Sequence, residues 1–593
     1  MPDPGRTWLL MPAGGGGDGI GHLARCLKLA APLGPRASFL VRHLDRGAQD
    51  LLARKLAAFP RGSRPAVLSR IPAKKRWDLL IVDARRLAAG ELADLMRHGL
   101  VVCLDEGGEA RNYAPFIVDT LPGLPGRPSA NLSDPSFLFL PRRVRTRPPA
   151  SVKRILLSLG GEDREHLGES LAAAIVRDGI AAPGGLTVVQ GPLSGPRQWP
   201  AGVRVVRGAD GLSGLLRSHD VLVTHFGMAA FEALASGIPS ILFNPSDYHA
   251  RLGEAAGFPM IGTGRPRLDA LKALLADPAS LYAHVRNFNR SIGTARGRKL
   301  SQVLRPLTMI GSSRCPVCGH SGNRVVARFA DRTYRCCTEC GVIGLESFSG
   351  KRKEYTAGYF SSEYKAQYGR TYIEDFESIR EASRPRVRIL RQLLGPGVTG
   401  RVVDVGCAYG PFLAAAGDAG LSGFGLDVSP GAVAHVKKSL GLPAVCAPFE
   451  TVERRRLPTK ISAVTLWYVI EHFPNTREAL ARAAALLPPG GVLAFSTPNG
   501  RGISARTDLE SFLRASPGDH FTVLSPRGLG RILRAHGLRL SRIRVTGHHP
   551  ERFPGALGNA ARRRPLAARV LRAVSVLLGL GDTFEAYAVK GST

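Results

Sequence analysis

Cysteine, aromatic residues and acidic residues are all scarce in this chain of 593 residues. Nine cysteines are too few to hold a chain of this length together, so we do not expect a secreted protein stabilised by disulfides. No apolar run approaches the roughly 20 residues that span a bilayer. The apolar stretch at 8–11 is too short for a signal sequence and lacks a basic flank. We therefore expect a cytoplasmic protein that is not secreted, transmembrane or fibrous.

The shortage of acidic residues leaves a strongly basic chain, because 81 Lys and Arg face 47 Asp and Glu, a formal charge of +34. Most of the basic residues are Arg, scattered among Ala, Gly and Pro. A nucleic-acid-binding protein more often concentrates its charge in a stripe with aromatic residues between, whereas aromatics make up 7% here. We do not expect nucleic acid as the main partner. Small phosphorylated ligands and anionic membrane surfaces fit the charge.

The length and the breaks in the pattern predict several folding units. The hydrophobic fraction of 44% is that of a globular protein, and at about 150 residues per domain the length gives roughly four units. Stretches rich in Pro, Gly and Arg interrupt the periodic pattern. They divide the chain into regions 1–150, 151–306, 311–345, 346–546 and 547–593.

Short apolar runs that precede helical patterns recur along the chain. Examples are LLIVD at 79–83, ILLSLGG at 155–161 and VVDVG at 402–406. Such runs are typical of parallel strands covered by helices on both faces. The predicted fold class is therefore α/β. Two doubly wound halves with a cleft between them are expected over 1–305, and a third unit of this kind over 398–545.

A glycine-rich loop at 14–22 lies between the first predicted strand and a helix. Backbone N–H groups and the helix dipole can hold an anion at such a place. The motif GIGHLARCLKLA puts His22 at the helix entrance and Arg25 one turn later.

This motif and two later ones occur in the order found in a group of nucleotide-sugar enzymes. The later motifs are RILLSLGGED at 154–163 and DVLVTHFGMAAFEALASGIPSILFNP at 220–245. With them, the N-terminal half of the chain resembles the nucleotide-sugar hydrolases of the pseudaminic-acid pathway. These are relatives of the lipid-II-forming N-acetylglucosaminyltransferases. The resemblance implies a GT-B fold that transfers or hydrolyses a nucleotide-sugar, with Glu232 on the ribose. The implied nucleotide-sugar-binding residues are Gly19, Gly21, Arg25, Gly160, Gly161, Gly227 and Glu232.

His22 is the candidate catalytic group of this half, as a general base or as a group that orients the sugar, because a neutral imidazole accepts a proton near pH 7. One alternative is that His22 only caps the helix. A half that binds without catalysis is another. Asp105 and Arg111 follow a later strand and are expected to face the cleft. The family's Asn-Gln pair is replaced here by Asp247-Tyr248-His249, which leaves the sugar and nucleotide open.

Five of the nine cysteines lie close together in the sequence. Two C-x-x-C-G motifs, formed by Cys315 with Cys318 and by Cys337 with Cys340, are separated by 18 residues. This spacing is typical of four thiolates around one Zn²⁺, and the glycines permit the tight turns. A redox C-x-x-C site would need a thioredoxin-like context. We expect a structural zinc ribbon, in which Cys336 is the alternative to Cys337 although the spacing favours Cys337.

RVVDVGCAYGPF at 401–412 is expected to form a strand, a glycine loop and the start of a helix. Asp404 lies at the strand end, and Gly406 and Gly410 let a ligand approach the backbone. Asp427 ends the next strand, 17 residues after Gly410, where its carboxylate could bind both hydroxyls of a ribose. The loop lacks the G-x-G-x-x-G pattern of dinucleotide sites.

This D-x-G-x-x-x-G pattern with a downstream Asp resembles class I S-adenosylmethionine-dependent methyltransferases. LWYVIEHFPN at 466–475, LLPPGGVLAFSTPN at 486–499 and DHFTVLSPRGLGRILRAHGL at 519–538 continue the match in order. The series resembles the ubiquinone O-methyltransferase-like group. The implied cofactor-binding residues are Asp404, Gly406, Gly410, Asp427, Phe449 and Glu450.

Glu471, His472 and His520 are the catalytic candidates of this third unit, since methyl transfer to a hydroxyl or carbon needs a base. The alternative is that Glu471 and His472 are a polar strand end that holds a loop. N-methylation is disfavoured because no Asn-Pro-Pro-aromatic motif follows the fourth strand.

The segment 561–581 combines a basic leader with apolar residues at helical spacing. The commoner interpretation is a helix packed on the methyltransferase. The alternative is peripheral contact with an anionic membrane, which would place the protein at the inner face. The clustered apolar residues are Leu566, Val570, Leu571, Val574, Leu577 and Leu578.

Together these patterns predict a bifunctional enzyme of surface-glycan biosynthesis. Its N-terminal half handles a nucleotide-sugar, and its C-terminal half methylates an oxygen or carbon of a sugar or glycan with S-adenosylmethionine beside a structural zinc. The zinc ribbon, the tyrosine-rich stretch 355–369 and the third unit resemble methyltransferases that modify sugars. The alternative is a zinc-ribbon RNA-modifying methyltransferase with a binding-only first half, whose RNA affinity would fall steeply with salt.

Overall fold

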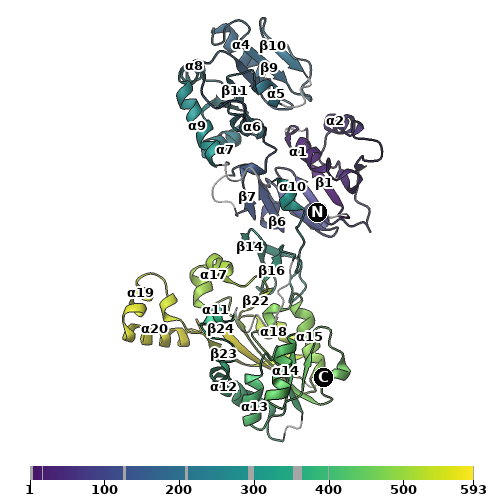
Figure 1. The fold of residues 1–593 in the computed structure, drawn as a ribbon, viewed down its shortest axis with the longest axis vertical. Coiled ribbons are helices and arrows are strands. Elements are labelled where there is room, and N and C mark those ends of the chain that lie inside the picture. Colours follow the sequence, from purple (N-terminus) through teal and green to yellow (C-terminus); the bar gives the residue numbers. More distant parts are fainter. Residues whose placement is uncertain are drawn as a thin grey trace. The chain divides into compact units, whose positions relative to one another are not determined.

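The chain divides into two compact units, Met1–Thr308 and Met309–Thr593, each of which contains parallel β-structure (Figure 1). Gly16, Gly17 and most of the stretch 355–369 lie outside the described residues. Within the described part of the chain, no helix has both the length and the apolar composition that crossing a bilayer requires. The computed structural model describes residues 5–15, 18–123, 128–207, 212–291, 299–350, 364–397 and 400–591.

The first sheet of the N-terminal unit is parallel and has seven strands in the order β3-β2-β1-β4-β5-β6-β7. Every residue of β1, β4 and β5 is buried, as expected of parallel strands covered on both faces. The strands are β1 (Trp8–Pro12), β2 (Ala37–Leu40), β3 (Ala66–Leu68), β4 (Leu79–Asp83), β5 (Leu100–Leu104), β6 (Phe116–Asp119) and β7 (Leu132–Ser133).

The second sheet of this unit is also parallel, with six strands in the order β10-β9-β8-β11-β12-β13. In both sheets the strand order reverses beside the first strand, at β1/β4 and at β8/β11. Doubly wound folds bind their ligands at the carboxyl ends of the strands next to such a reversal. The strands are β8 (Ile155–Ser158), β9 (Leu186–Gln190), β10 (Arg204–Arg207), β11 (Val221–Thr224), β12 (Ser240–Asn244) and β13 (Met260–Thr263).

The helices of the N-terminal unit alternate with these strands along the chain. In α1, Leu23, Cys26 and Leu29 are buried at three-residue spacing, so one face of the helix packs on the protein. The predicted doubly wound α/β arrangement of both halves is confirmed. The helices are α1 (Gly21–Ala30), α2 (Arg46–Ala57), α3 (Ala89–Met96), α4 (Leu167–Arg177), α5 (Ser213–Leu216), α6 (Met228–Ser236), α7 (Asp247–Ala255), α8 (Leu268–Ala276), α9 (Pro278–Ser291) and α10 (Leu300–Leu304).

The end of this unit returns to its beginning. The Arg6 guanidinium, just before β1, donates a hydrogen bond to the carbonyl of Leu307 (2.6 Å), just after α10. Leu300 and Leu304 of α10 are buried. Residues 300–307 therefore close the N-terminal unit on the side of its first sheet.

The cysteine-rich region belongs to the C-terminal unit. Its antiparallel sheet takes a fourth strand from far along the chain, and Cys315 and Val317 are buried in the same apolar cluster as Leu480. The region 311–345, expected as a zinc ribbon, thus shares its sheet and core with the rest of the unit. The sheet consists of β14 (Asn323–Phe329), β15 (Arg332–Cys337), β16 (Ile343–Ser347) and β22 (Thr522–Val523).

The main sheet of the C-terminal unit has seven strands in the order β19-β18-β17-β20-β21-β24-β23. β24 lies between β21 and β23 and is antiparallel to both. The sequence pattern ended this region at residue 546, and β24 lies beyond that boundary. It was missed because a helical segment separates it from the other strands along the chain. The strands are β17 (Arg401–Val405), β18 (Gly423–Asp427), β19 (Ala444–Cys446), β20 (Ile461–Trp467), β21 (Val492–Pro498), β23 (Leu538–Thr546) and β24 (Thr583–Lys590).

Two of the helices of this unit form a pair between β23 and β24, and Figure 1 shows this pair projecting from the sheet. The helices are α11 (Tyr364–Tyr368), α12 (Phe376–Leu394), α13 (Pro411–Asp418), α14 (Pro430–Ser439), α15 (Thr476–Leu486), α16 (Ile503–Thr507), α17 (Leu509–Ala515), α18 (Leu529–Arg534), α19 (Ala556–Arg563) and α20 (Pro565–Leu577).

Candidate functional site

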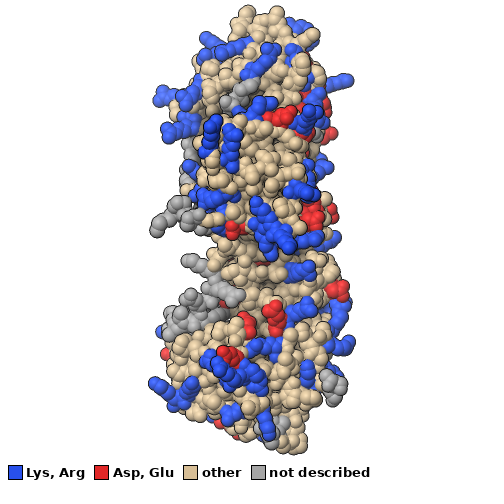
Figure 2. All heavy atoms as spheres, turned by 90° about the vertical axis from the view of Figure 1, so that its right-hand side faces the viewer, with Lys and Arg blue, Asp and Glu red and all other residues tan. Residues whose placement is uncertain are grey.

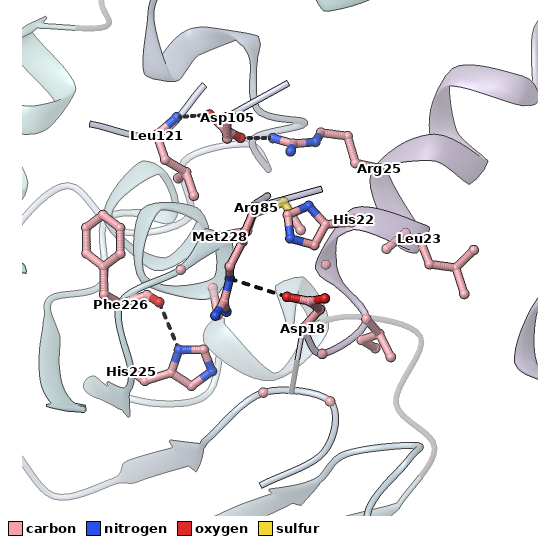
Figure 3. Close-up of a pocket in the computed structure, with 18 of the residues that line it drawn as sticks. Asp18, His22, Leu23, Arg25, Arg85, Asp105, Leu121, His225, Phe226 and Met228 are labelled. Atoms are coloured by element: carbon pink, nitrogen blue, oxygen red, sulfur yellow. Dashed lines mark hydrogen bonds and ion pairs between the residues drawn. The ribbon is translucent and has the colours of Figure 1, made fainter. Parts of the chain in front are cut away.

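A cavity of about 1170 Å³ lies in the N-terminal unit. His22 and Arg25 of α1 line it together with Asp105, which follows β5, and with His225 and Met228 from the second half (Figure 3). Both halves therefore contribute to one ligand-sized cavity, at the strand ends where doubly wound folds bind ligands.

His22 belongs to a polar network around the end of β4. It lies in the first turn of α1, and its Nδ1 lies 2.6 Å from Oδ1 of Asp83. The helix is preceded by Ile20 without a side-chain cap, so His22 does not act as the cap. When Nδ1 donates to the carboxylate, Nε2 is left as a proton acceptor. This is the geometry of an oriented general base.

Arg25, which was expected to bind ligand, instead has its guanidinium engaged by two aspartates of the protein. Its side chain is buried and contacts Asp83 through Nε (2.6 Å) and Nη2 (2.5 Å), and Asp105 through Nη1 (2.6 Å). Burial raises the pKa of Asp83, but the charge of Arg25 and the hydrogen bonds from Arg25 and His22 outweigh it and lower this pKa to about 2. Asp83 therefore remains ionised and can orient His22, while Arg25 supports both carboxylates.

The second half contributes glycine turns and one carboxylate to the cavity. Gly160, Gly161, Gly227 and Glu232 all line it. A Cβ on Gly161 would lie 2.6 Å from the Ile20 side chain, so the two halves meet closely beside the loop before α1. Glu232 lies on α6, and burial raises its pKa although Lys28 lies 4.0 Å away. Gly227 directly precedes α6, which turns the amino end of that helix toward the cavity.

Gly19 and Gly21, the remaining predicted residues of this half, also line the cavity. Arg111 lines it as well, and its guanidinium contacts Asp119 (2.7 Å). Like Arg25, Arg111 is held in a buried ion pair with an aspartate, and it therefore forms part of the cavity wall.

Sequence reasoning missed two histidines and an arginine among the residues that line the cavity. His225 follows β11, His249 lies on α7, and Arg85 follows β4. Burial lowers the pKa of both imidazoles, and that of His249 to about 3. The two neutral rings lie 5.9 Å apart, and His225 Nδ1 donates to the carbonyl of Phe226 (2.8 Å). The available signal was their position just after strands, where site residues gather.

In the C-terminal unit, the predicted glycine loop connects β17 to α13. Gly406 and Gly410 have φ angles of +68° and +85°, a conformation that favours glycine. Ala408 between them also has a positive φ, of +47°. The loop therefore turns tightly enough for its backbone N–H groups to approach a ligand at the amino end of α13.

Two buried aspartates flank this loop. Asp427, at the end of β18, accepts hydrogen bonds from the backbone N–H groups of Ala408 and Ser429, both at 2.8 Å. Asp404, in β17, accepts a hydrogen bond from the Thr465 hydroxyl (2.6 Å), and burial raises its pKa to about 7. The sequence thus places one acid at each side of the loop, and Asp427 is the one fixed to the loop backbone.

Glu471, His472 and His520, the catalytic candidates of this unit, lie together although His520 comes from a separate segment. One ligand atom of each lies within 4.8 Å of the others. The two imidazole rings lie 4.7 Å apart, and His472 Nδ1 lies 3.2 Å from Asp519. A carboxylate and two imidazoles at this spacing could remove a proton or hold a divalent cation.

Burial has opposite consequences for this acid and this base. It raises the pKa of Glu471 to about 7. It lowers the pKa of His472, but the hydrogen bond with Asp519 and the charge of Glu471 outweigh it, so that pKa is raised. Near neutral pH the cluster can therefore exchange a proton.

Phe449 and Glu450 follow β19, which is parallel to β18 and ends at the same edge of the sheet as Asp427. The Phe449 ring is buried in the main apolar cluster and packs 5.9 Å from the Phe473 ring, whereas Glu450 is exposed. Phe449 therefore contributes to the core in this structure, and Glu450 faces solvent.

The four predicted cysteines form a compact cluster. Cys315 and Cys340 have sulfur atoms 3.5 Å apart, and those of Cys318 and Cys337 are 3.6 Å apart. Sulfur atoms around a tetrahedral Zn²⁺ with 2.3 Å bonds would be about 3.8 Å apart, so the cluster needs only a small expansion. Cys337, and not its neighbour Cys336, completes the set of four.

Comparison with known proteins bears on the C-terminal unit. A family described as "Methyltransferase domain" matches residues 377–542. The ubiquinone biosynthesis O-methyltransferase of Burkholderia thailandensis is 28% identical over 176 residues, 27% of this chain and 73% of that protein. The enzyme of the same name from Thiobacillus denitrificans is 26% identical over 186 residues, 30% of this chain and 80% of that protein.

Among solved structures, magnesium protoporphyrin IX methyltransferase from Synechocystis PCC 6803, with bound SAH, covers 39% of this chain and 97% of its own, at 15% identity and a TM-score of 0.28. The family match spans the region that contains the glycine loop and Asp427. The C-terminal region of this chain therefore carries a class I S-adenosylmethionine-dependent methyltransferase domain with homologues among the ubiquinone O-methyltransferases.

Proposed function

We propose that this protein is a bifunctional enzyme of surface-glycan biosynthesis, in which the methyltransferase domain modifies a hydroxyl oxygen or a carbon of a sugar or glycan. The observation that carries the methyltransferase half is the tight loop Gly406–Gly410 fixed to the Asp427 carboxylate. A second observation supports an oxygen or carbon acceptor: a carboxylate and two imidazoles, which could deprotonate such an acceptor, lie together.

The residues around the loop fit S-adenosylmethionine. Asp427 would accept hydrogen bonds from the ribose hydroxyls, and the loop backbone from Gly406 to Gly410 would contact the rest of the cofactor. When bound, S-adenosylmethionine supplies an electrophilic methyl group. Glu471, His472 and His520 would then hold the acceptor and take its proton.

The pH dependence of methyl transfer tests the role of Glu471. Burial raises the pKa of Glu471 to about 7, so the basic carboxylate is the minor form below that pH and the main form above it. We expect kcat to rise about tenfold per pH unit below 7 and to level off above it. Glu471→Gln should lose this rise and about tenfold of the rate at pH 8, because both imidazoles remain.

Glu478→Gln, a change on α15 outside the cluster, is the matched control and should keep the wild-type pH profile. Repeating the assay with EDTA separates proton removal from cation binding. An unchanged profile in Glu471→Gln would contradict a catalytic role for this carboxylate.

We further propose that Cys315, Cys318, Cys337 and Cys340 bind a structural Zn²⁺ that holds the acceptor side of the methyltransferase site. β16 of the cysteine-rich sheet pairs with β22, and the N–H of Leu345 donates to the carbonyl of Phe521 (3.0 Å). Phe521 directly follows His520. The metal would therefore support the segment that carries His520 without touching the reacting atoms.

Loss of this metal should affect turnover more than cofactor binding. In Cys315→Ser/Cys340→Ser we expect the zinc content, measured by elemental analysis, to fall from about one per chain to near zero. We expect kcat to fall about tenfold while the Kd for S-adenosylmethionine changes less than about twofold, since the glycine loop lies on other strands. Cys446→Ser is the control. Wild-type protein without zinc would contradict the assignment.

For the N-terminal half we propose a GT-B arrangement that transfers or hydrolyses a nucleotide-sugar. The supporting observation is the ligand-sized cavity in which His22 is oriented by Asp83. Glu232 would bind the ribose, and the turns at Gly160 and Gly227 would approach the diphosphate. His22 would take the proton of the attacking hydroxyl or water through Nε2.

The wide dispersal of basic side chains supports small anionic substrates. Figure 2 shows Lys and Arg spread singly or in small groups over the face that it presents.

Incubation with a panel of nucleotide-sugars, followed by chromatography of the released nucleotide, tests the proposed activity of the N-terminal half. Release that requires an acceptor would indicate transfer, and release without one would indicate hydrolysis. No release from any member of the panel would contradict the proposal. Such substrates would place both reactions in the cytoplasm.

A further inference from the structure

The helix pair between β23 and β24 is the surface feature that neither proposed reaction uses. We call residues 556–580, which comprise α19, α20 and the turn after α20, the basic hairpin. It lies outside the region 377–542 that matches the methyltransferase family. In Figure 1 the two helices project from the C-terminal unit.

One side of α20 is anchored to the unit. Leu571 and Ser575 are buried, and the Ser575 hydroxyl lies 2.8 Å from Nδ1 of His548, which follows β23. Arg552 and Asp582, on either side of the hairpin, form an ion pair at 2.7 Å. The hairpin is therefore held in a fixed orientation by its inner side.

The opposite side of α20 is apolar and faces solvent. Leu566, Val570 and Leu577 are 74%, 55% and 84% exposed. Their spacing of four and seven residues puts them on one face of the helix, away from Leu571 and Ser575. Leu557 of α19 and Leu578 are 53% and 60% exposed as well. Large apolar side chains gathered on an outer face usually mark an interaction surface.

The charge of the basic hairpin has one sign. It contains five arginines and no aspartate or glutamate. All five are exposed, and two of them lie on α20 beside the apolar face. They are Arg562, Arg563, Arg564, Arg569 and Arg572.

We infer that the basic hairpin docks the protein on an anionic lipid bilayer. Leu566, Val570 and Leu577 would enter the boundary between headgroups and acyl chains, and the arginines would contact lipid phosphates. The charge complementarity selects this occupant, since a second copy of the chain would bring five more arginines to the same face. Docking would hold the methyltransferase domain at the bilayer surface whether or not its acceptor is a glycan.

Vesicle cosedimentation of the full chain tests this inference. We expect binding to vesicles of phosphatidylcholine with one quarter phosphatidylglycerol, at least about tenfold weaker binding to phosphatidylcholine alone, and weakening with added salt. Leu566→Ser/Val570→Ser/Leu577→Ser and, separately, Arg569→Gln/Arg572→Gln should each bind about tenfold more weakly. Matched controls elsewhere should bind like wild type: Val67→Ser/Val176→Ser, two other exposed apolar residues, and Arg97→Gln/Arg177→Gln.

The thermal midpoint and the affinity for S-adenosylmethionine show whether each variant is folded, and we expect both to match the wild type. Wild-type protein that stays in the supernatant with both kinds of vesicle would overturn the inference. So would equal binding by the wild type and both hairpin variants. A dimer that the leucine variant converts to a monomer, without a change in vesicle binding, would assign the apolar face to a second copy instead.

Discussion

Asp427→Ala is expected to lower the affinity of the chain for S-adenosylmethionine by about a hundredfold or more. The carboxylate is the group that would accept both ribose hydroxyls, and two such bonds to a charged acceptor account for a loss of that size. It also accepts the N–H groups of Ala408 and Ser429, so its removal frees the loop that would face the cofactor. Methyl transfer should be lost with the binding.

Isothermal titration calorimetry on the wild type and the variant measures this loss. Asp418→Ala is the matched control, because Asp418 is an aspartate at the far end of α13 from the loop and pairs with Arg380 (2.9 Å). The control should keep wild-type affinity. Equal affinity in Asp427→Ala and the wild type would mean that the cofactor lies elsewhere.

His22→Ala is expected to lower nucleotide release from the nucleotide-sugar substrate by about 10²- to 10⁴-fold, the usual contribution of a general base. His22 Nδ1 contacts the ionised Asp83, which leaves Nε2 to accept the proton of the attacking group. The substitution removes that acceptor and leaves the buried pair of Asp83 and Arg25 intact. The fold and substrate binding should therefore survive.

Steady-state kinetics separate these effects, because loss of a base lowers kcat while KM changes little. His98→Ala is the control: His98 lies outside the cavity and its Nδ1 donates to the Lys75 carbonyl (2.8 Å). Persistence of wild-type turnover in His22→Ala would leave His22 with only a structural role. Loss of turnover together with a lower thermal midpoint would indicate that the network around Asp83, and not the base, was damaged.

Strands and glycine loops with strong local signals could be predicted from the sequence. β4 and β5 consist entirely of buried residues, so they appear as continuous apolar runs. The loop before α13 needs glycine at positive φ, which marks Gly406 and Gly410 in the sequence. The four cysteines that lie together were found because two C-x-x-C-G motifs at this separation are typical of a zinc site.

Features that depend on contacts between distant segments could not be predicted in this way. Arg25 stands one turn after His22 and was expected to bind ligand, but the aspartates that bury it come from β4 and from the segment after β5. β24 could not be assigned because its neighbours are β21 and β23, and a helix pair separates it from β23. Likewise, a two-residue strand such as β22 has no periodicity of its own.

The tail illustrates the same limit in another form. Sequence periodicity indicated that 561–581 is helical and amphipathic, but it could not tell which side packs. The structure places Leu571 and Ser575 inward and Leu566 and Leu577 outward. The apolar residues of this helix are thus divided between packing and exposure, which neither of the two sequence interpretations described.

The most direct test of two independent active sites in one chain is a single reaction analysed by mass spectrometry. Wild type, His22→Ala and Asp427→Ala would each be incubated with methyl-labelled S-adenosylmethionine, the panel of nucleotide-sugars and RNA as a competing acceptor. We expect free nucleotide and a methylated sugar or glycan from the wild type, loss of nucleotide release only in His22→Ala, and loss of methylation only in Asp427→Ala. Methyl label on RNA, with no nucleotide released by any of the three proteins, would contradict it.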